Sequence, residues 1–257
     1  MVDVTLLEGE RIDRVNEDIV LIQKKAGLTF GTDAFLLASY LRPRPKDRAV
    51  ELGTGTGIVS LLAAARGRFA HIDAVEIQED FATLATRNVK INGLCERITV
   101  HKADVRDLRA QTLGYEVDTV FANPPYMGTQ SGARNDSDYK YLARHEVCGG
   151  IEDFCAAAGR LLKHGGHFVC VFRPDRLSSL MTALSAHHLE PKRMTFVHAD
   201  ENSEPSMVLI DAIKGGAEGL RVSAPLILHD AAKDGGTRPL SARAQRIYDT
   251  MSFDKEE

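Results

Sequence analysis

The chain lacks several features that define large classes of protein. It has no tryptophan, only 6% aromatic residues, and no apolar run long enough to cross a bilayer. Its N-terminal residues 1–14 contain no signal-peptide core. The cysteines show no Cys-x-x-Cys spacing, so we expect reduced thiols rather than a disulfide framework or a zinc site. These absences predict a cytoplasmic protein that holds no metal. The four cysteines are Cys95, Cys148, Cys155 and Cys170.

The chain also lacks an excess of positive charge, with 32 Lys and Arg against 36 Asp and Glu. The formal net charge is −4, which argues against a surface coated for nonspecific nucleic-acid binding but leaves room for a local basic patch. With 257 residues, 44% of them hydrophobic, the chain can bury a full core. One large domain with small additions is the expected organisation.

Apolar runs alternate with helical patterns through the middle of the chain. With right-handed crossovers, this alternation predicts an α/β fold with a doubly wound, mostly parallel sheet of seven strands. The last two strands are joined by a polar turn and are expected to form an antiparallel hairpin at the sheet edge. The predicted strands are 49–52, 71–75, 98–101, 117–122, 167–172, 192–198 and 207–213. The predicted helices are 34–41, 58–66, 80–92, 151–163 and 175–187.

The two ends of the chain do not show the alternation of strand and helix patterns seen in the middle. Short β-like pieces occupy Val4 to Lys25, and Thr32 is a candidate N-cap for the first helix. A proline-rich, cationic linker spans 42–48. Residues 220–229 read as extended, and we expect a mobile tail after Asp230. Three parts follow: a β-rich extension over 1–47, a main domain over 48–215, and a C-terminal segment over 216–257.

The tetrapeptide Asn123-Pro124-Pro125-Tyr126 directly follows a buried strand. In open α/β sheets, ligands bind at the carboxyl ends of the strands. The Asn123 amide and the Pro124 carbonyl offer two acceptors, and the Tyr126 ring offers a stacking surface. This set suits a planar group with an exocyclic amine, such as adenine. A plain Asn-Pro turn after a strand would look the same, so the tetrapeptide does not decide alone.

A second signal is a glycine loop between a strand and a helix, running from Glu51 to Gly57. Glycines at such a position allow a tight turn and a close approach of backbone to ligand. A lone G-x-G-x-G is weak evidence, but Glu76 ends the next strand 19 residues after Gly57, near the spacing of a ribose-hydroxyl acceptor. Asp104 ends the third strand. The predicted cofactor site comprises Glu51, Gly53, Thr54, Gly55, Gly57, Glu76, Ile77, Asp104, Val105 and Asn123.

A nicotinamide dinucleotide is the first rival ligand for this loop. Dinucleotide sites normally carry G-x-G-x-x-G and place the pyrophosphate at a helix N-terminus. Here an acid, Glu51, precedes the glycines and would repel phosphate, whereas it suits the ammonium of an amino-acid moiety. S-adenosylmethionine has that ammonium, a ribose and an adenine, and no phosphate. We expect Glu51 to face the ammonium directly or through water, Glu76 the ribose hydroxyls and Asp104 the adenine amine. Each acid could instead be a solvated strand-end carboxylate, and the neighbouring Asp107 could replace Asp104.

In this order, these motifs resemble those of the class I S-adenosylmethionine-dependent methyltransferases that methylate amines. More narrowly, the chain resembles the bacterial tRNA adenine-N6 methyltransferase family, whose characterised members modify the adenine beside the anticodon of a valine tRNA. The resemblance covers roughly residues 10–215 and implies a Rossmann-like methyltransferase sheet. The narrower match uses Phe30 to Ala38 upstream, and Ser131-Gly132, Asn135 and Ala143 to Glu146 downstream.

The resemblance implies methyl transfer from the sulfonium to a neutral amine, with Asn123, Pro124, Pro125 and Tyr126 as the catalytic set. Acceptors at Asn123 Oδ1 and the Pro124 carbonyl would aim the amine lone pair at the methyl group. Tyr126 would stack on a base that has left its own stack. His145 is more readily a structural residue than a base, and Phe30 more readily a core residue than part of a lid.

The implied partner is RNA, with tRNA the first choice, and no membrane. Arg134, Lys140 and Arg144 adjoin the tetrapeptide in sequence and are the predicted substrate contacts, through phosphates. Two further basic clusters are weaker candidates for RNA contacts, because each is slightly better explained as an ordinary solvent-exposed surface. They are Arg42, Arg44, Lys46 and Arg48, and Arg173, Arg176, Lys192 and Arg193.

Three other readings stay open. The runner-up is a methyltransferase of protein glutamine amides, which present a similar planar –NH2, although those enzymes usually carry an N-terminal helical domain. A guanine-N2 methyltransferase of ribosomal RNA is third. From a different class, the chain could bind cofactor or RNA without turnover, and an intact tetrapeptide beside an intact glycine loop counts against that reading.

Overall fold

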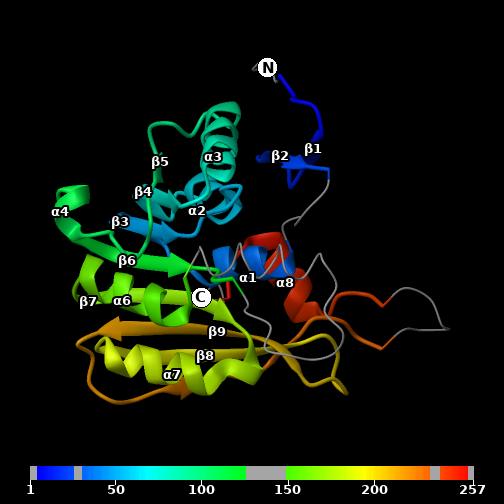
Figure 1. Ribbon diagram of the computed structural model, residues 1–257. Helices are drawn as coiled ribbons and strands as arrows, with labels where there is room; N and C mark the ends of the chain where they lie inside the picture. The colour runs from blue at the N-terminus through cyan, green and yellow to red at the C-terminus, as the bar shows by residue number, and fades with distance from the viewer. Residues whose placement is uncertain (1–4, 26–30, 126–148, 232–237, 254–257) are drawn as a thin grey trace, which may run out of the picture.

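A nine-stranded sheet forms the centre of the molecule in the computed structural model, which describes residues 5–25, 31–125, 149–231 and 238–253 (Figure 1). The strand order is β10-β8-β9-β7-β6-β3-β4-β5, with β11 also pairing with β8. The strands are β3 (Arg44–Leu52), β4 (Phe69–Glu76), β5 (Ile98–Lys102), β6 (Val117–Ala122), β7 (Leu162–Phe172), β8 (Leu189–His198), β9 (Pro205–Lys214), β10 (Arg221–Val222) and β11 (Leu226–Ile227). A separate hairpin pairs β1 (Glu10–Arg14) with β2 (Val20–Lys24) in antiparallel fashion.

Helices cover both faces of this sheet and enclose two apolar cores. One core takes side chains from α1 (Thr32–Tyr40), α2 (Ile58–Ala65), α3 (Glu79–Ile91) and α8 (Ala242–Thr250). The other takes them from α6 (Ile151–Leu161) and α7 (Leu177–Ala186), near α4 (Ala110–Leu113) and the 3-10 turn η1 (Pro174–Arg176). Within the described ranges, no helix is long and apolar enough to cross a membrane.

The predicted fold class is confirmed, but two details of the sheet differ from the prediction. Two short strands, β10 and β11, add to β8, so the described sheet has nine strands rather than seven. The antiparallel strand is not at the edge: β9 lies between β7 and β8 and is antiparallel to both. The tight turn at 200–203 makes β8 and β9 neighbours, but sequence does not say which of the two docks beside β7.

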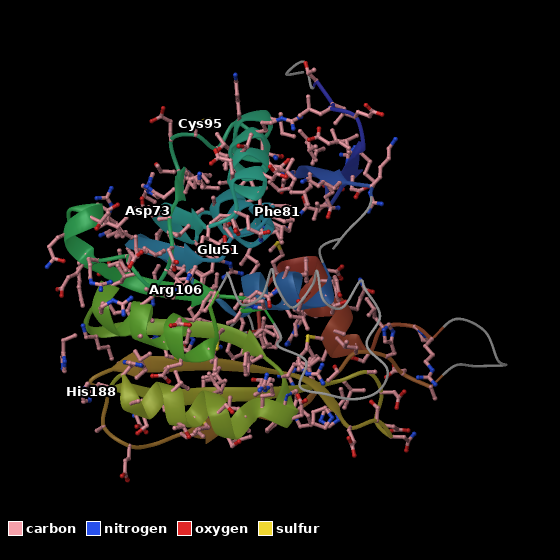
Figure 2. All side chains as sticks on the ribbon, in the orientation of Figure 1. Glu51, Asp73, Phe81, Cys95, Arg106 and His188 are labelled. Carbon is pink, nitrogen blue, oxygen red and sulfur yellow. The ribbon has the colours of Figure 1, made fainter. Side chains whose placement is uncertain are left out.

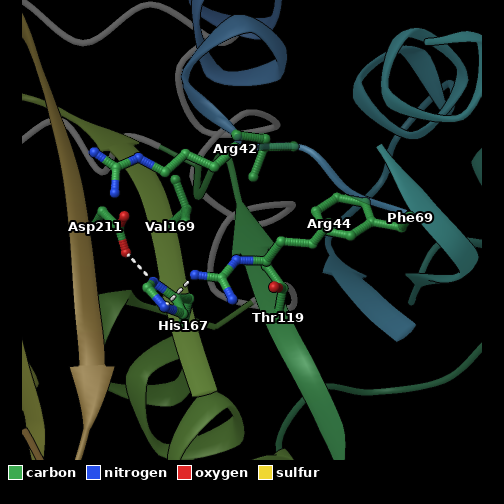
Figure 3. Close-up of a pocket in the computed structure, with 8 residues that line it drawn as sticks. Arg42, Arg44, Phe69, Thr119, His167, Val169 and Asp211 are labelled. Atoms are coloured by element: carbon green, nitrogen blue, oxygen red, sulfur yellow. Dashed lines mark hydrogen bonds and ion pairs between the residues drawn. The ribbon is translucent and has the colours of Figure 1, made fainter. Parts of the chain in front are cut away.

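The segment predicted as a linker over 42–48 is mostly strand, because β3 begins at Arg44. The two prolines suggested a linker, yet Pro45 lies where the register between β3 and β4 shifts, so its missing N–H breaks no regular ladder. Arg44 is held in place by a relay (Figure 3). Its guanidinium lies 2.7 Å from Nε2 of His167, whose Nδ1 lies 2.7 Å from Asp211.

The expectation of a mobile tail after Asp230 is wrong for the described residues 238–253. Ser241 caps α8 by accepting a hydrogen bond from the Ala244 N–H at 3.1 Å, and Ile247 is fully buried. Tyr248 stacks on Phe35 of α1 with ring centroids 4.4 Å apart. The helix was missed because its polar residues hide a narrow apolar stripe. Through these contacts α8 packs against α1 (Figure 1).

Two asparagines, Asn88 of α3 and its C-cap Asn92, attach the N-terminal hairpin to the main body. Asn92 accepts the Val20 N–H at 3.0 Å and donates to the Val20 carbonyl at 2.7 Å. Asn88 does the same for Ile22, at 2.7 and 3.1 Å. A helix thus satisfies the backbone groups of β2 as a neighbouring strand would. The predicted β-rich extension is confirmed as a hairpin.

Candidate active site

Three of the predicted site residues lie at one edge of the sheet because three strands end at the same level. Leu52 of β3 pairs with Val75 of β4 and with Ala122 of β6. The residues that follow, Gly53, Glu76 and Asn123, therefore stand side by side. With neighbouring strands about 4.8 Å apart, Asn123 and Glu76 are roughly 10 Å apart with the glycine loop between them. The sheet order also reverses between β3 and β6, which is where α/β sheets bind ligands.

The glycine loop has the conformation that its sequence requires. Gly53, Gly55 and Gly57 all have positive φ, at 71°, 56° and 88°. At Gly53 an added Cβ would also lie 3.3 Å from the Phe154 ring, so space as well as conformation favours glycine. The Thr54 N–H donates to the Val75 carbonyl at 2.9 Å and fixes the loop to β4. The loop is a rigid turn that leads into α2.

Glu51 lies beneath this loop and is 1% exposed (Figure 2). Its Oε2 accepts hydrogen bonds from the Thr54 hydroxyl at 2.6 Å, from the Ser60 N–H at 3.1 Å and from the Ser60 hydroxyl. Burial raises the pKa of Glu51 to about 7 despite these bonds. These contacts brace the loop against α2. Whether this buried carboxyl also faces an ammonium group stays a prediction.

Glu76 ends β4 and is 5% exposed. One carboxylate oxygen accepts the Gly55 N–H and the other accepts the Gln78 N–H, both at 2.9 Å. The carboxylate therefore joins the glycine loop to the start of α3. Ile77 follows it in the same turn and is half-buried.

Asp104 lies beyond the end of β5 and is engaged by Arg106. The guanidinium Nε lies 2.9 Å from both carboxylate oxygens, and a backbone N–H bond of 2.9 Å adds to them. The hydrogen bonds from the Arg106 side chain hold the pKa of Asp104 below its ordinary value. A ligand amine at Asp104 would compete with this partner. Val105 is buried, and its carbonyl accepts a hydrogen bond from Arg160 at 3.0 Å.

Asn123 is half-buried at the end of β6, and Pro124 behind it is buried. The Asn123 amide Nδ2 donates to Asp33 Oδ2 at 2.8 Å. Asp33 belongs to the first turn of α1, so this bond joins two segments that are 90 residues apart in sequence. Helix α1 begins at Thr32, two residues before the predicted start at 34. The predicted N-cap Thr32 is therefore already helical, and the N-cap is Gly31.

Several predicted residues lie outside the described residues. They are Tyr126 of the tetrapeptide, the substrate contacts Arg134, Lys140 and Arg144, and Phe30 and His145. Their roles remain predictions.

The residues of the two weaker basic clusters are spread over several elements, chiefly β3, η1 and β8. Arg44 stands at the start of β3, eight residues and about 25 Å of strand before Leu52. Arg48 lies over the Tyr115 ring, 4.0 Å from its centroid. Arg193 lies over the buried Tyr40 ring at 3.7 Å, and Lys192 donates a hydrogen bond to the Ala217 carbonyl. Arg173 follows β7 at the site edge and pairs with Asp175 at 2.9 Å.

Sequence reasoning missed three residues that hold the site together. Ser60 binds Glu51, and Asn88 donates to the Thr56 carbonyl of the glycine loop at 2.9 Å. Asp33 binds Asn123. Asp33 lay inside the segment 30–38 that the family resemblance had already picked out, which is a usable signal. No sequence pattern marks Ser60 or Asn88, because their partners are defined by the tertiary fold.

Comparison with known proteins defines the class. The family model of the methyltransferase small domain matches residues 25–190, a span that includes the glycine loop, Glu76, Asp104 and Asn123. The chain belongs to this methyltransferase family.

Individual relatives point to a narrower group. A protein of Phocaeicola vulgatus named tRNA1(Val) (adenine(37)-N6)-methyltransferase is 30% identical over 186 residues, which are 72% of this chain and 77% of that protein. A protein of the same name from Bacteroides fragilis is 31% identical over 186 residues, again 72% and 77%.

Solved structures agree on the fold. A predicted O-methyltransferase of Agrobacterium tumefaciens superposes with a TM-score of 0.68 at 24% identity, over 86% of this chain and 97% of that one. The TYW2 protein of M. jannaschii, solved in complex with AdoMet, gives a TM-score of 0.54 at 14% identity, over 81% and 87%. At these identities the likeness supports the Rossmann-like methyltransferase fold alone.

Proposed function

We propose that this protein transfers a methyl group from S-adenosylmethionine to the exocyclic N6 amine of an adenine in RNA, with tRNA as the first candidate. The observation that carries the proposal is the position of Asn123-Pro124-Pro125, at the end of β6 and level with the glycine loop and Glu76. The names of the relatives, tRNA adenine-N6 methyltransferases, support the same substrate.

The residues at this edge fit the sulfonium cofactor better than a dinucleotide. The Gly55 N–H, which a pyrophosphate would need, is already taken by the Glu76 carboxylate. Carboxylates end β4 and lie just beyond β5, where they repel phosphate but accept hydroxyl and amine hydrogens. Glu76 would hold the ribose, and the loop over Gly53 to Gly57 would lie against the amino-acid end. When bound, the cofactor supplies an activated methyl group on a positively charged sulfur.

The protein's own part in the reaction is to orient the acceptor amine. An adenine amine is a weak nucleophile because its lone pair is delocalised into the ring. Two acceptors, Asn123 Oδ1 and the Pro124 carbonyl, would hold both N–H bonds and favour a pyramidal nitrogen. The methylated nitrogen becomes acidic as positive charge develops on it, so a neutral amide suffices and no strong base is required.

Methyl transfer to unmodified tRNA tests the proposal. The protein is incubated with labelled cofactor and tRNA, and the digested nucleosides are identified by mass spectrometry. We expect N6-methyladenosine with the wild type and its loss with Asn123→Ala, which removes one acceptor. Absence of label in RNA, with cofactor binding demonstrated, would contradict the proposal. Label on a guanosine or on a glutamine amide of a protein would identify the alternative acceptor.

A further inference from the structure

The orientation of the Asn123 amide matters for the reaction proposed above, because its two ends have opposite hydrogen-bonding character. Oδ1 only accepts hydrogen bonds, and Nδ2 only donates them. An acceptor amine must meet Oδ1, and a flipped amide would present two N–H groups to it. Some part of the structure must therefore set which end faces outward.

Asp33 contacts the Nδ2 end of this amide. An ionised aspartate can only accept hydrogen bonds, so the 2.8 Å contact between Asp33 Oδ2 and Asn123 requires the Nδ2 end on the Asp33 side. The flipped amide would place oxygen against oxygen. The hydrogen-bonding character of the two side chains therefore fixes the orientation of the amide.

Asp33 is itself held in place. Its other oxygen, Oδ1, accepts the Ala34 N–H at 2.9 Å. A Cβ at Gly31 would lie 2.7 Å from that oxygen, so the side chain fills the space that only a glycine leaves open. Residues 34–40 of α1 are all buried, and Phe35 is stacked under Tyr248 of α8. The Asp33 carboxylate therefore belongs to a helix, α1, that core packing holds in place.

We propose that Asp33 is a positioning residue for methyl transfer. Its carboxylate turns the Asn123 amide so that Oδ1 meets the acceptor amine, and its negative charge polarises that amide. Positive charge develops on the amine nitrogen as the carbon–sulfur bond of the sulfonium breaks and the carbon–nitrogen bond forms. The hydrogen bond from the amine to the polarised Oδ1 of Asn123 is therefore stronger in the transition state than in the ground state. The sulfur leaves as a neutral thioether, and the methylated nitrogen then releases its proton to water. The inference rests on the proposed function, since it concerns the same acceptor.

A side-chain exchange gives the sharpest test. Asp33→Asn keeps the shape but removes the charge and allows either amide orientation, and we expect kcat to fall on the order of 10- to 100-fold, as for other partners that orient a functional side chain. The dissociation constant of the cofactor should stay unchanged.

Asn123→Asp places two carboxylates against each other and should lose more activity. The double variant restores a donor facing an acceptor and should be at least about 10-fold more active than Asn123→Asp alone.

Asp80→Asn is the matched control. Asp80 also stands in the first turn of a helix, α3, but its side chain pairs with Lys24 at 2.8 Å and is 75% exposed. We expect this control to leave kcat unchanged. A double variant that is less active than both single variants would overturn the proposal, as would an active Asp33→Asn with unchanged kcat.

Nuclear magnetic resonance of the full chain separates this inference from the proposed function. In the wild type, one Nδ2 proton of Asn123 should be shifted and protected from exchange, and both effects should diminish in Asp33→Asn but not in Asp80→Asn. An inactive wild type that shows this signature would refute the RNA substrate and retain the role of Asp33 in orienting Asn123. Identical Asn123 signals in wild type and Asp33→Asn would refute the inference whatever the activity.

Discussion

Ionisation of the buried Glu51 should make the protein less stable as the pH rises. The pKa of Glu51 in the folded protein is about 7, against an ordinary value of 4.5, because the carboxyl is buried. Below pH 4.5 both folded and unfolded chains hold the proton, and Glu51 contributes no pH dependence. Between the two values the folded chain holds more protons than the unfolded one, so stability falls with rising pH. Above pH 7 both forms are ionised and the loss is constant.

Integration between the two pKa values gives a loss of about 2.5 kcal/mol from pH 5 to pH 8. Glu51→Gln removes this titration while keeping an acceptor for Thr54 and Ser60. The stability of the variant relative to wild type should therefore increase by about 2.5 kcal/mol over that range, or roughly 5–10 °C in Tm for a chain of this size. All other titrating groups are shared by the two proteins and cancel in the comparison.

The measurement is thermal or urea unfolding of both proteins at pH 5, 6, 7 and 8 without cofactor. A difference in stability that stays constant across these pH values would refute the raised pKa of Glu51. A bound cofactor that places its ammonium near Glu51 would lower this pKa and reduce the pH dependence of the wild type. The same experiment with cofactor therefore tests the predicted contact.

Three further outcomes follow from contacts described above. Asn88→Ala removes amide bonds to β2 and to the glycine loop, so we expect a loss of about 2–4 kcal/mol in urea unfolding and faster proteolysis of the hairpin, whereas Thr86→Ala on the same helix should change little. Ile247→Ala should cost about 2–5 kcal/mol because the side chain is fully buried, and a loss under 0.5 kcal/mol would mean that α8 is not docked. In native thiol labelling followed by peptide mapping, Cys95 should react and Cys170 should not, because Cys170 is buried and its pKa is raised to about 12.

Sequence alone predicted the middle of the chain well because local chemistry dictates it. Glycines with positive φ at 53, 55 and 57, together with alternating apolar runs, lead to one fold class. The order of β8 and β9 could not be predicted, because both strands of a hairpin offer similar edges to β7. The tail was wrongly predicted to be mobile because α8 carries only a short stripe of apolar residues. These residues join the core only through their packing against α1.

For the site, the strand-end residues were predictable and their partners were not. Glu76 and Asn123 were identified from their positions at the ends of apolar runs, and Glu51 as the acid that precedes the glycine loop. The register of β4, β3 and β6 brings Glu76, Asn123 and the glycine loop together. The bond between Asn123 and Asp33 spans 90 residues, and the contacts of Glu51 with Ser60 depend on how α2 leaves the loop. Such pairs are set by tertiary packing, which a single sequence does not encode locally.

The docking of α8 on α1 also bears on synthesis of the chain. Phe35 and Tyr40 are synthesised early. Their ring partners, Tyr248 and Phe253, follow more than 200 residues later. Until then these two rings of α1 lack the aromatic partners that they have in the folded protein. The helix that carries Asp33 therefore reaches its final packing only after α8 has been made, more than 200 residues after α1.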